Sequence, residues 1–164
     1  MEGQPHIVPL SRGDAGEILT LQRAAYVSEA QAHADLTLAP LTQTLSQLLD
    51  ELGSPAVLAF GIRDHARLVA AVRVMIEDSV GHLGRLVVAP DRQGNGFGSA
   101  LLRAVETLVP RTVTEMRLFT GEKSHANLRL YKRFGYSEVR RSSAGDYDLV
   151  HLAKSLSSGR SLSR

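Results

Sequence analysis

The chain has 164 residues, 43% of them hydrophobic and 22% charged, which is the length and composition of one soluble domain. It contains no cysteine, so a disulfide framework, a zinc–thiolate site and a cysteine nucleophile are excluded. Its 19 Lys and Arg against 17 Asp and Glu leave a net charge of only +2, which argues against a nucleic-acid binder.

No apolar run approaches the ~20 residues that a membrane-spanning helix needs. The first residues lack the cationic and apolar regions of a signal peptide. We therefore expect a cytoplasmic protein that does not associate with membranes.

The N-terminal third of the chain predicts a short strand followed by two helices. Residues 6–10 are strand-like, and the capping residues after them begin a helix that extends to about Ala32. Pro40 ends helical geometry beyond this helix. Thr42 or Thr44 can then cap a second helix, which has four inward-facing leucines: Leu45, Leu48, Leu49 and Leu52.

The rest of the chain alternates between strand and helix patterns. Three neighbouring antiparallel strands are expected at 56–63, 68–76 and 82–89. Hydrophobic residues then recur every three or four positions, which predicts an amphipathic helix over 96–109. The remaining elements are a strand (112–120), a helix (124–134, ended by Gly135) and a pair of strands (136–141 and 147–152).

This order of elements predicts a single α/β (α+β) domain over residues 1–153. We expect a mixed, mostly antiparallel sheet of six to seven strands flanked by about four helices. Residues 154–164 are rich in Ser, Arg and Gly, and they are expected to form a tail that frays.

A glycine-rich turn leads from the strand at 82–89 into the helix at 96–109. Gly94, Gly96 and Gly98 alternate along it, so backbone N–H groups can converge at a helix N-terminus, where the partial positive charge favours an anion. The spacing lacks the Gly-Lys-Ser/Thr of a P-loop, and Ser99 stands where a dinucleotide fingerprint requires glycine. The turn therefore predicts a site for phosphate or diphosphate.

Two segments resemble the GNAT superfamily of N-acetyltransferases. The run Gln93-Gly94-Asn95-Gly96-Phe97-Gly98 is similar to its acyl-CoA signature, Gln/Arg-x-x-Gly-x-Gly/Ala. The segment 124–136 resembles the family's helix that ends in Leu-Tyr and is followed by Gly-Phe, with Tyr136 in place of Phe. With the order of elements, the likeness extends from His6 to about Leu152, and it implies a strand pair that a bulge splays apart.

The resemblance implies acetyl-CoA as the acyl donor, with its diphosphate held by the N–H groups of Gln93 to Ser99 and its pantetheine paired with Leu86, Val87 and Val88. The places where many family members carry Asn and Ala hold Ser124 and Asn127, and either can meet the cofactor. The expected cofactor-binding residues are Leu86, Val87, Val88, Arg92, Gln93, Gly94, Asn95, Gly96, Phe97, Gly98, Ser99, Ser124, Asn127 and Tyr131.

Acetyl transfer needs a neutral amine, a stabilised oxyanion and a proton for the departing thiolate. A backbone N–H near Val87 or Val88 would meet the oxyanion, and the resemblance assigns the proton to Tyr131, which is protonated at neutral pH. For the base, His82 offers an imidazole of suitable pKa. Other candidates are Asp146, Asp148, His151 or a water relay.

By the same resemblance, acceptor selection is expected to fall to the first two helices and the loop that joins them, where Tyr26, His33 and Asp35 lie. Asp35 can attract a cationic amine. His33 and Asp35 alone are too few ligands for a metal site, so no metal is expected. Because members of the family often associate, a homodimer is also consistent with the resemblance.

The sequence thus predicts direct transfer of an acetyl group from acetyl-CoA to a primary amine of a small molecule or peptide. A covalent acetyl-enzyme is not expected, because there is no cysteine and no evident serine–histidine pair. The alternative is a non-catalytic module that binds acyl-CoA as a sensor or interaction domain. Neither hypothesis involves nucleic acid or a membrane.

Overall fold

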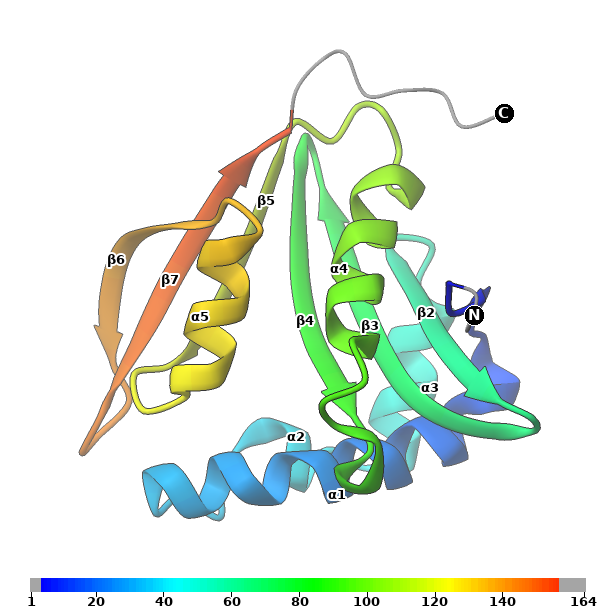
Figure 1. Ribbon diagram of the computed structural model, residues 1–164, viewed down its shortest axis with the longest axis horizontal. Helices are drawn as coiled ribbons and strands as arrows, with labels where there is room; N and C mark the ends of the chain where they lie inside the picture. The colour runs from blue at the N-terminus through cyan, green and yellow to red at the C-terminus, as the bar shows by residue number, and fades with distance from the viewer. Residues whose placement is uncertain (1–3, 157–164) are drawn as a thin grey trace.

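Seven strands form one sheet in the computed structural model, which describes residues 4–156 (Figure 1). The strands are β1 (Ile7–Pro9), β2 (Val57–Asp64), β3 (Arg67–Glu77), β4 (Val80–Val88), β5 (Glu115–Gly121), β6 (Ser137–Ser143) and β7 (Asp148–Ser155). The helices are α1 (Ala15–His33), α2 (Ala39–Thr42), α3 (Leu45–Gly53), α4 (Phe97–Leu108) and α5 (His125–Arg133), with the 3-10 turns η1 (Arg12–Asp14) and η2 (Pro90–Arg92). The sheet is mixed and mostly antiparallel, which confirms the fold class predicted from the sequence, and its strand order is β1-β2-β3-β4-β5-β7-β6.

Helices cover both faces of the N-terminal half of the sheet, because β3 is apolar on both faces. Val72 lies in one hydrophobic core with Leu101 of α4. Its neighbour Ala71 lies in a second core with Ile18 of α1. Since successive strand residues point to opposite faces, α4 packs on one side of the sheet and α1 on the other.

Strands β4 and β5 are parallel neighbours over a short distance only. Residues Val80 to His82 pair with Glu115 to Arg117, and beyond them the two strands diverge (Figure 1). The other neighbouring strands of the sheet are antiparallel. Past His82, the edge of β4 that faces β5 therefore has no strand partner among the described residues, and Figure 1 shows α1 lying across the open end of this wedge.

A β-bulge lies on β4 just inside the wedge. Ala71 of β3 faces Val87, whereas Arg73 faces Gly84, so Arg85 and Leu86 together stand opposite one residue of β3. Arg85 has a φ of 54°, in the left-handed region that side chains other than glycine rarely adopt. Bulges of this kind redirect side chains and are frequent beside active sites.

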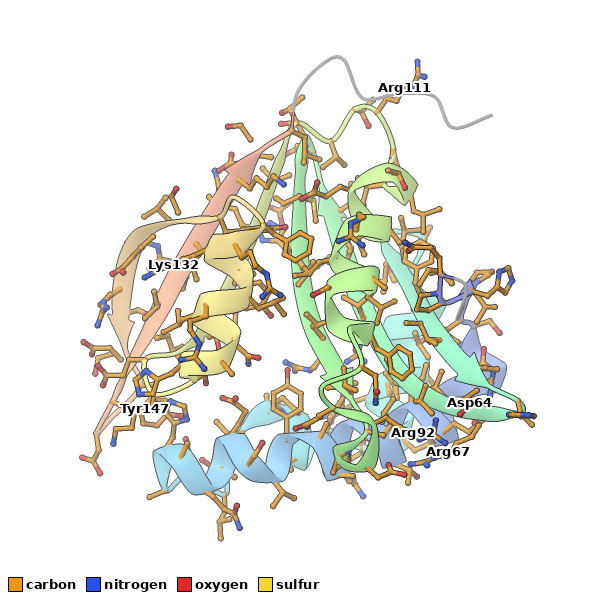
Figure 2. All side chains as sticks on the ribbon, in the orientation of Figure 1. Asp64, Arg67, Arg92, Arg111, Lys132 and Tyr147 are labelled. Atoms are coloured by element: carbon orange, nitrogen blue, oxygen red, sulfur yellow. The ribbon has the colours of Figure 1, made fainter. Side chains whose placement is uncertain are left out.

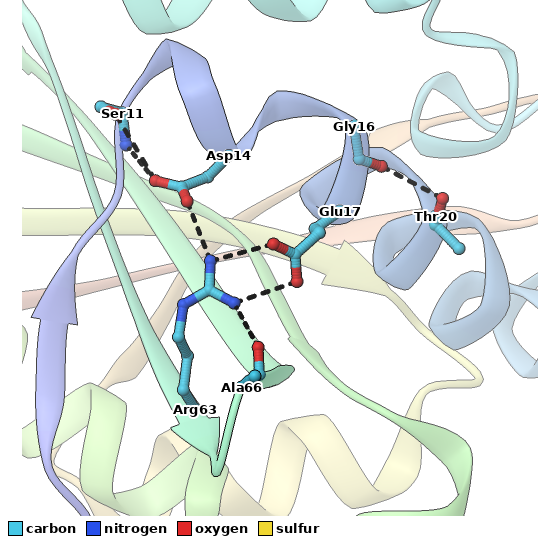
Figure 3. Close-up of polar contacts among 7 residues, drawn as sticks. All are labelled: Ser11, Asp14, Gly16, Glu17, Thr20, Arg63 and Ala66. Carbon is cyan, nitrogen blue, oxygen red and sulfur yellow. Dashed lines mark hydrogen bonds and ion pairs between the residues drawn. The ribbon is translucent and has the colours of Figure 1, made fainter.

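Ion pairs anchor the beginning of α1 to β2. The Arg63 guanidinium donates to Asp14 Oδ1 at 2.8 Å and to Glu17 Oε2 at 3.0 Å, as Figure 3 shows. The hydrogen bond from Arg63 lowers the pKa of Glu17, although burial opposes it. These contacts fix one end of the helix whose other end reaches the wedge.

Three details differ from the sequence prediction. Pro40 lies in the first turn of α2 instead of ending a helix, a position where its missing N–H costs nothing. The prediction that Leu45 faces inward is wrong: it stands at the exposed start of α3 with 45% of its surface accessible. β7 continues through Ser155 and Leu156 is buried, so the domain extends past residue 153, and the rest of the expected tail lies outside the described residues.

Candidate functional site

A cleft of about 900 Å³ occupies the wedge between β4 and β5. Its walls come from α1, from β4 and the loop after it, and from α5. We refer to this space as the wedge cleft. Within residues 4–156, no helix is both long and apolar enough to cross a membrane, and no three His, Asp or Glu side chains are grouped to hold a metal ion.

The loop from Gln93 to Ser99 has free backbone donors, and all of its residues line the wedge cleft except Asn95, an expected cofactor ligand. Gly94 and Gly96 have φ values of 82° and 78°, so the turn depends on glycine at both positions. No N–H from Gln93 to Ser99 donates a hydrogen bond to any of the described residues. A Cβ at Gly94 or Gly96 would meet nothing within 4 Å, so the loop surrounds open space at the N-terminus of α4. This geometry fits a diphosphate.

Ion pairs anchor the residues that directly precede this loop. Arg67 donates to both carboxylate oxygens of Asp91, at 2.7 and 2.6 Å, and lowers the pKa of Asp91 to about 2. Arg92 pairs with Asp64, and these residues gather at one end of the β2–β3 hairpin (Figure 2). The guanidinium of Arg92, an expected cofactor ligand, is thus engaged with Asp64, although Arg92 still lines the wedge cleft.

The predicted pantetheine strand lies on the wall of the wedge cleft. Leu86, Val87 and Val88 all line it. On the β3 side, Val87 and Val88 pair with Ala71 and Ala70. The opposite edge is the one without a strand partner, so an extended chain can pair with it.

Tyr131 of α5 lines the same cleft and is 6% exposed. Burial raises the pKa of its hydroxyl, and the nearby Tyr26 and Glu29 raise it further. No described residue forms a hydrogen bond with this hydroxyl. It is therefore a protonated donor at neutral pH.

Glu29 of α1 is a cleft residue that the sequence analysis missed. Its carboxylate accepts hydrogen bonds from Ser124 Oγ and, at 3.3 Å, from Asn127 Nδ2. Asn127 also lines the wedge cleft, whereas the buried Ser124 lies behind it against Glu29. A signal was present: Tyr26, Glu29 and His33 are spaced for one face of a helix.

The predicted acceptor-binding residues Tyr26, His33 and Asp35 all line the wedge cleft. Both ring nitrogens of His33 have backbone partners, because Nδ1 lies 2.9 Å from the Glu29 carbonyl oxygen and Nε2 accepts from the Lys123 N–H at 3.1 Å. A Cβ at Gly121 would lie 2.1 Å from Nε2, so this contact requires glycine there.

Tyr147 connects His33 to Asp35 at the same end of the cleft. Its ring centroid is 4.5 Å from that of His33, and its hydroxyl donates to Asp35 Oδ2 at 2.6 Å. Figure 2 places Tyr147 beside the end of α1. Hydrogen bonds from Thr37 and then from Tyr147 lower the pKa of Asp35, so it stays ionised.

The structure does not bring the expected base candidates to the wedge cleft. His82 lies where β4 and β5 still pair, between Met75 of β3 and Arg117 of β5. The other three candidates are also absent from the cleft lining: Asp146, Asp148 and His151. Glu29 is the carboxylate that lies near Tyr131.

A family model described as the acetyltransferase (GNAT) family matches residues 18–136, which include the glycine loop, the wedge and α5. The chain belongs to the GNAT acetyltransferase family. Membership supports acyl transfer as the activity and an acyl-CoA as the ligand of this GNAT protein. No curated protein matches its sequence significantly.

Solved structures share the fold of this GNAT protein at low sequence identity. The ribosomal-protein-S18-alanine N-acetyltransferase from Escherichia coli has a TM-score of 0.76 at 18% identity, covering 93% of this chain and 94% of its own. The spermidine N-acetyltransferase from Vibrio cholerae, with CoA and spermine, has a TM-score of 0.73 at 16% identity, covering 94% and 97%. The PaiA N-acetyltransferase from Thermoplasma acidophilum, with coenzyme A, has a TM-score of 0.72 at 16% identity, covering 89% and 96%.

Proposed function

We propose that this GNAT protein transfers an acetyl group from acetyl-CoA directly to a primary amine. The observation that carries the proposal is the set of free N–H groups from Gln93 to Ser99, in a loop that lines the same cleft as Tyr131. The free amides match the charge and size of a diphosphate. Acetyl-CoA supplies the thioester, and the chain supplies the groups that bind and protonate.

Tyr131 acts as the acid in this proposal. As the neutral amine nitrogen bonds to the thioester carbonyl carbon and the C–S bond breaks, the Tyr131 hydroxyl gives its proton to the sulfur. The proton that the new amide nitrogen then loses returns to the tyrosinate, directly or through water. Its raised pKa keeps the proton available at neutral pH. Backbone N–H groups on the open edge of β4, near Val87 or Val88, polarise the carbonyl oxygen.

Glu29 binds the amine in this proposal. It is a carboxylate in the lining of the wedge cleft, and its effect on the pKa of Tyr131 shows that the two groups lie within electrostatic reach of each other. The carboxylate holds the cationic amine and accepts its proton, directly or through water. Glu29 thus fills the role for which the sequence offered His82.

Two measurements test the proposal. Calorimetry should show coenzyme A binding at micromolar to low millimolar concentration, and absence of binding in this range would overturn the proposal. Thiol release from acetyl-CoA should then rise with members of a panel of primary amines. Binding of coenzyme A without any amine-stimulated release would instead favour the sensor alternative.

A further inference from the structure

Arg85 is a cation in the wedge cleft without an acidic partner. Its Nε is buried and has no hydrogen-bond acceptor among the described residues. Within residues 4–156, no carboxylate lies within ion-pair distance of the Arg85 guanidinium. The strained φ of 54° at the bulge is what places a long cationic side chain at this point of β4.

The neighbourhood of Arg85 adds to the positive charge instead of cancelling it. Arg73 is 4% exposed and close enough to Arg85 for each charge to be felt by the other. Arg73 has an acidic partner, with Glu51 Oε1 at 3.2 Å from Nε in an ion pair, and its Nη1 donates to Gln22 Oε1 at 3.0 Å, although its buried Nε, like that of Arg85, makes no hydrogen bond to the described residues. Glu51 pairs with Arg73 and not with Arg85, and of these two arginines only Arg85 lines the wedge cleft.

Tyr26 lies within electrostatic reach of both Arg85 and Glu29, the carboxylate of the proposed reaction centre. Burial raises the pKa of the Tyr26 hydroxyl, Glu29 raises it further, and Arg85 opposes the shift. Both charges are therefore within electrostatic reach of one side chain. Glu29 also acts on Tyr131. The cleft lining thus contains a carboxylate within electrostatic reach of the proposed proton donor and, at Tyr26, a guanidinium whose Nε is unpaired.

We propose that Arg85 binds a carboxylate of the acceptor, so that the acceptor is a small amine of the amino-acid class. The inference rests on the proposed function, because it assigns the amine of the same molecule to Glu29. A guanidinium is suited to a carboxylate by its paired donors. A polyamine, which carries only positive charges, would meet Arg85 with like charge and leave its buried Nε unpaired.

The test compares matched amines in acetyl-CoA turnover. Free amino acids are paired with their amides, which keep the α-amine and remove the carboxylate charge, and spermidine is included. We expect kcat/KM for the acids to exceed that for their amides by about 10- to 100-fold, as for loss of a charged hydrogen-bond partner. Equal use of acids and amides, or preference for spermidine, would overturn the proposal.

The variant Arg85→Gln should remove this preference. We expect KM for the acids to rise at least tenfold, with KM for acetyl-CoA and turnover of the amides little changed. Arg85→Gly repeats the test without backbone strain, since glycine accepts the positive φ. The control is Arg117→Gln, because Arg117 is exposed on β5 and paired with Glu115 outside the wedge cleft. Equal loss of acid and amide turnover in both Arg85 variants would contradict a carboxylate site.

Calorimetry separates failure of this inference from failure of the proposed function. The acids and amides are titrated into protein saturated with coenzyme A, with wild type and Arg85→Gln side by side. If amines are acetylated but Arg85→Gln does not change the preference for acids over amides, acetyl transfer is supported and the carboxylate site is overturned. If no amine is acetylated, the proposed function fails. Weaker binding of the acids by Arg85→Gln than by wild type then still supports the carboxylate site, and equal binding by the two proteins overturns it.

Discussion

The hydroxyl of Tyr131 faces the wedge cleft from a ring that is buried against Tyr136, with centroids 5.9 Å apart. The two hydroxyls have raised pKa values because both rings are buried. They differ in position, since only Tyr131 of this pair lines the cleft. This difference provides a matched pair of substitutions.

Tyr131→Phe should lower kcat by about 10²- to 10⁴-fold, the usual contribution of a positioned acid. Coenzyme A affinity should change less than twofold, because the ring remains. Steady-state kinetics and calorimetry measure the two quantities. Tyr136→Phe is the control and should keep wild-type kcat, so equal losses in both variants would exclude an acid role for Tyr131.

Glu29→Gln should raise KM for the amine about tenfold or more, since it removes the charge that holds a cationic amine while nearly keeping the volume. Glu17→Gln on the same helix is the control, because Glu17 faces Arg63 outside the cleft (Figure 3). Acetylation rates measured against amine concentration check both. Unchanged amine KM in Glu29→Gln would remove Glu29 from the site.

Sequence reasoning located Tyr131 but not Glu29 for a physical reason. Tyr131 lies in a local pattern whose spacing is visible within one helix. The role of Glu29 depends on Ser124 and Asn127, which are 95 and 98 residues away along the chain. The spacing of Glu29 with Tyr26 and His33 marks one face of the helix, but burial and pairing across such a distance leave no local sign of what that face contacts.

At the level of elements, the shape of the loop before α4 depends on a left-handed backbone conformation at its glycines. Gly96 is the N-cap of α4, with a left-handed φ of 78°. An alanine there costs roughly 1–2 kcal/mol in this conformation. Relaxation of the loop would turn its free N–H groups away from one another.

Gly96→Ala should therefore weaken coenzyme A binding by about tenfold, as measured by calorimetry. Gly16→Ala is the control, since Gly16 lies in α1 with no described atom within 4 Å of an added Cβ. That change should add up to ~1 kcal/mol of stability and leave binding intact. Undiminished affinity in Gly96→Ala would show that the left-handed turn is dispensable for the ligand.

The periodicity of hydrophobic residues predicted which segments are helices and strands. It did not predict the wedge between β4 and β5. The helix at 96–109 was predicted within a residue of each end of α4, because its apolar face repeats regularly. The short pairing of β4 with β5 and the position of β7 between β5 and β6 are both contacts between segments far apart in the chain. Periodicity reports which face of an element is buried and carries no information about its neighbour.

At the scale of the whole molecule, the pKa values of the tyrosines reflect how deeply folding buries them. All four are among the described residues, and each has a raised pKa with burial as the main cause. For Tyr147 the value is about 12, with the hydrogen bond to Asp35 contributing. The folded protein therefore keeps protons that the unfolded chain loses near pH 10.

Stability should accordingly fall as the pH rises above 10. A raised folded-state pKa contributes stability that is complete below the unfolded value and is lost as the pH passes from about 10 to about 12 for Tyr147. Urea unfolding at pH 8 and pH 11 measures the loss, and it should be smaller in Tyr147→Phe. Tyrosinate absorbance that appears at pH 10 without unfolding would contradict this expectation.

The open edge of β4 also has a consequence for handling the protein. An extended carrier lying along it would act as an additional strand, closing a backbone ladder that the polypeptide leaves incomplete. A ligand present at 100 times its Kd adds about 2.7 kcal/mol to the free energy of unfolding. Purification and storage with the carrier should thus protect a surface that, when bare, invites self-association of neighbouring molecules.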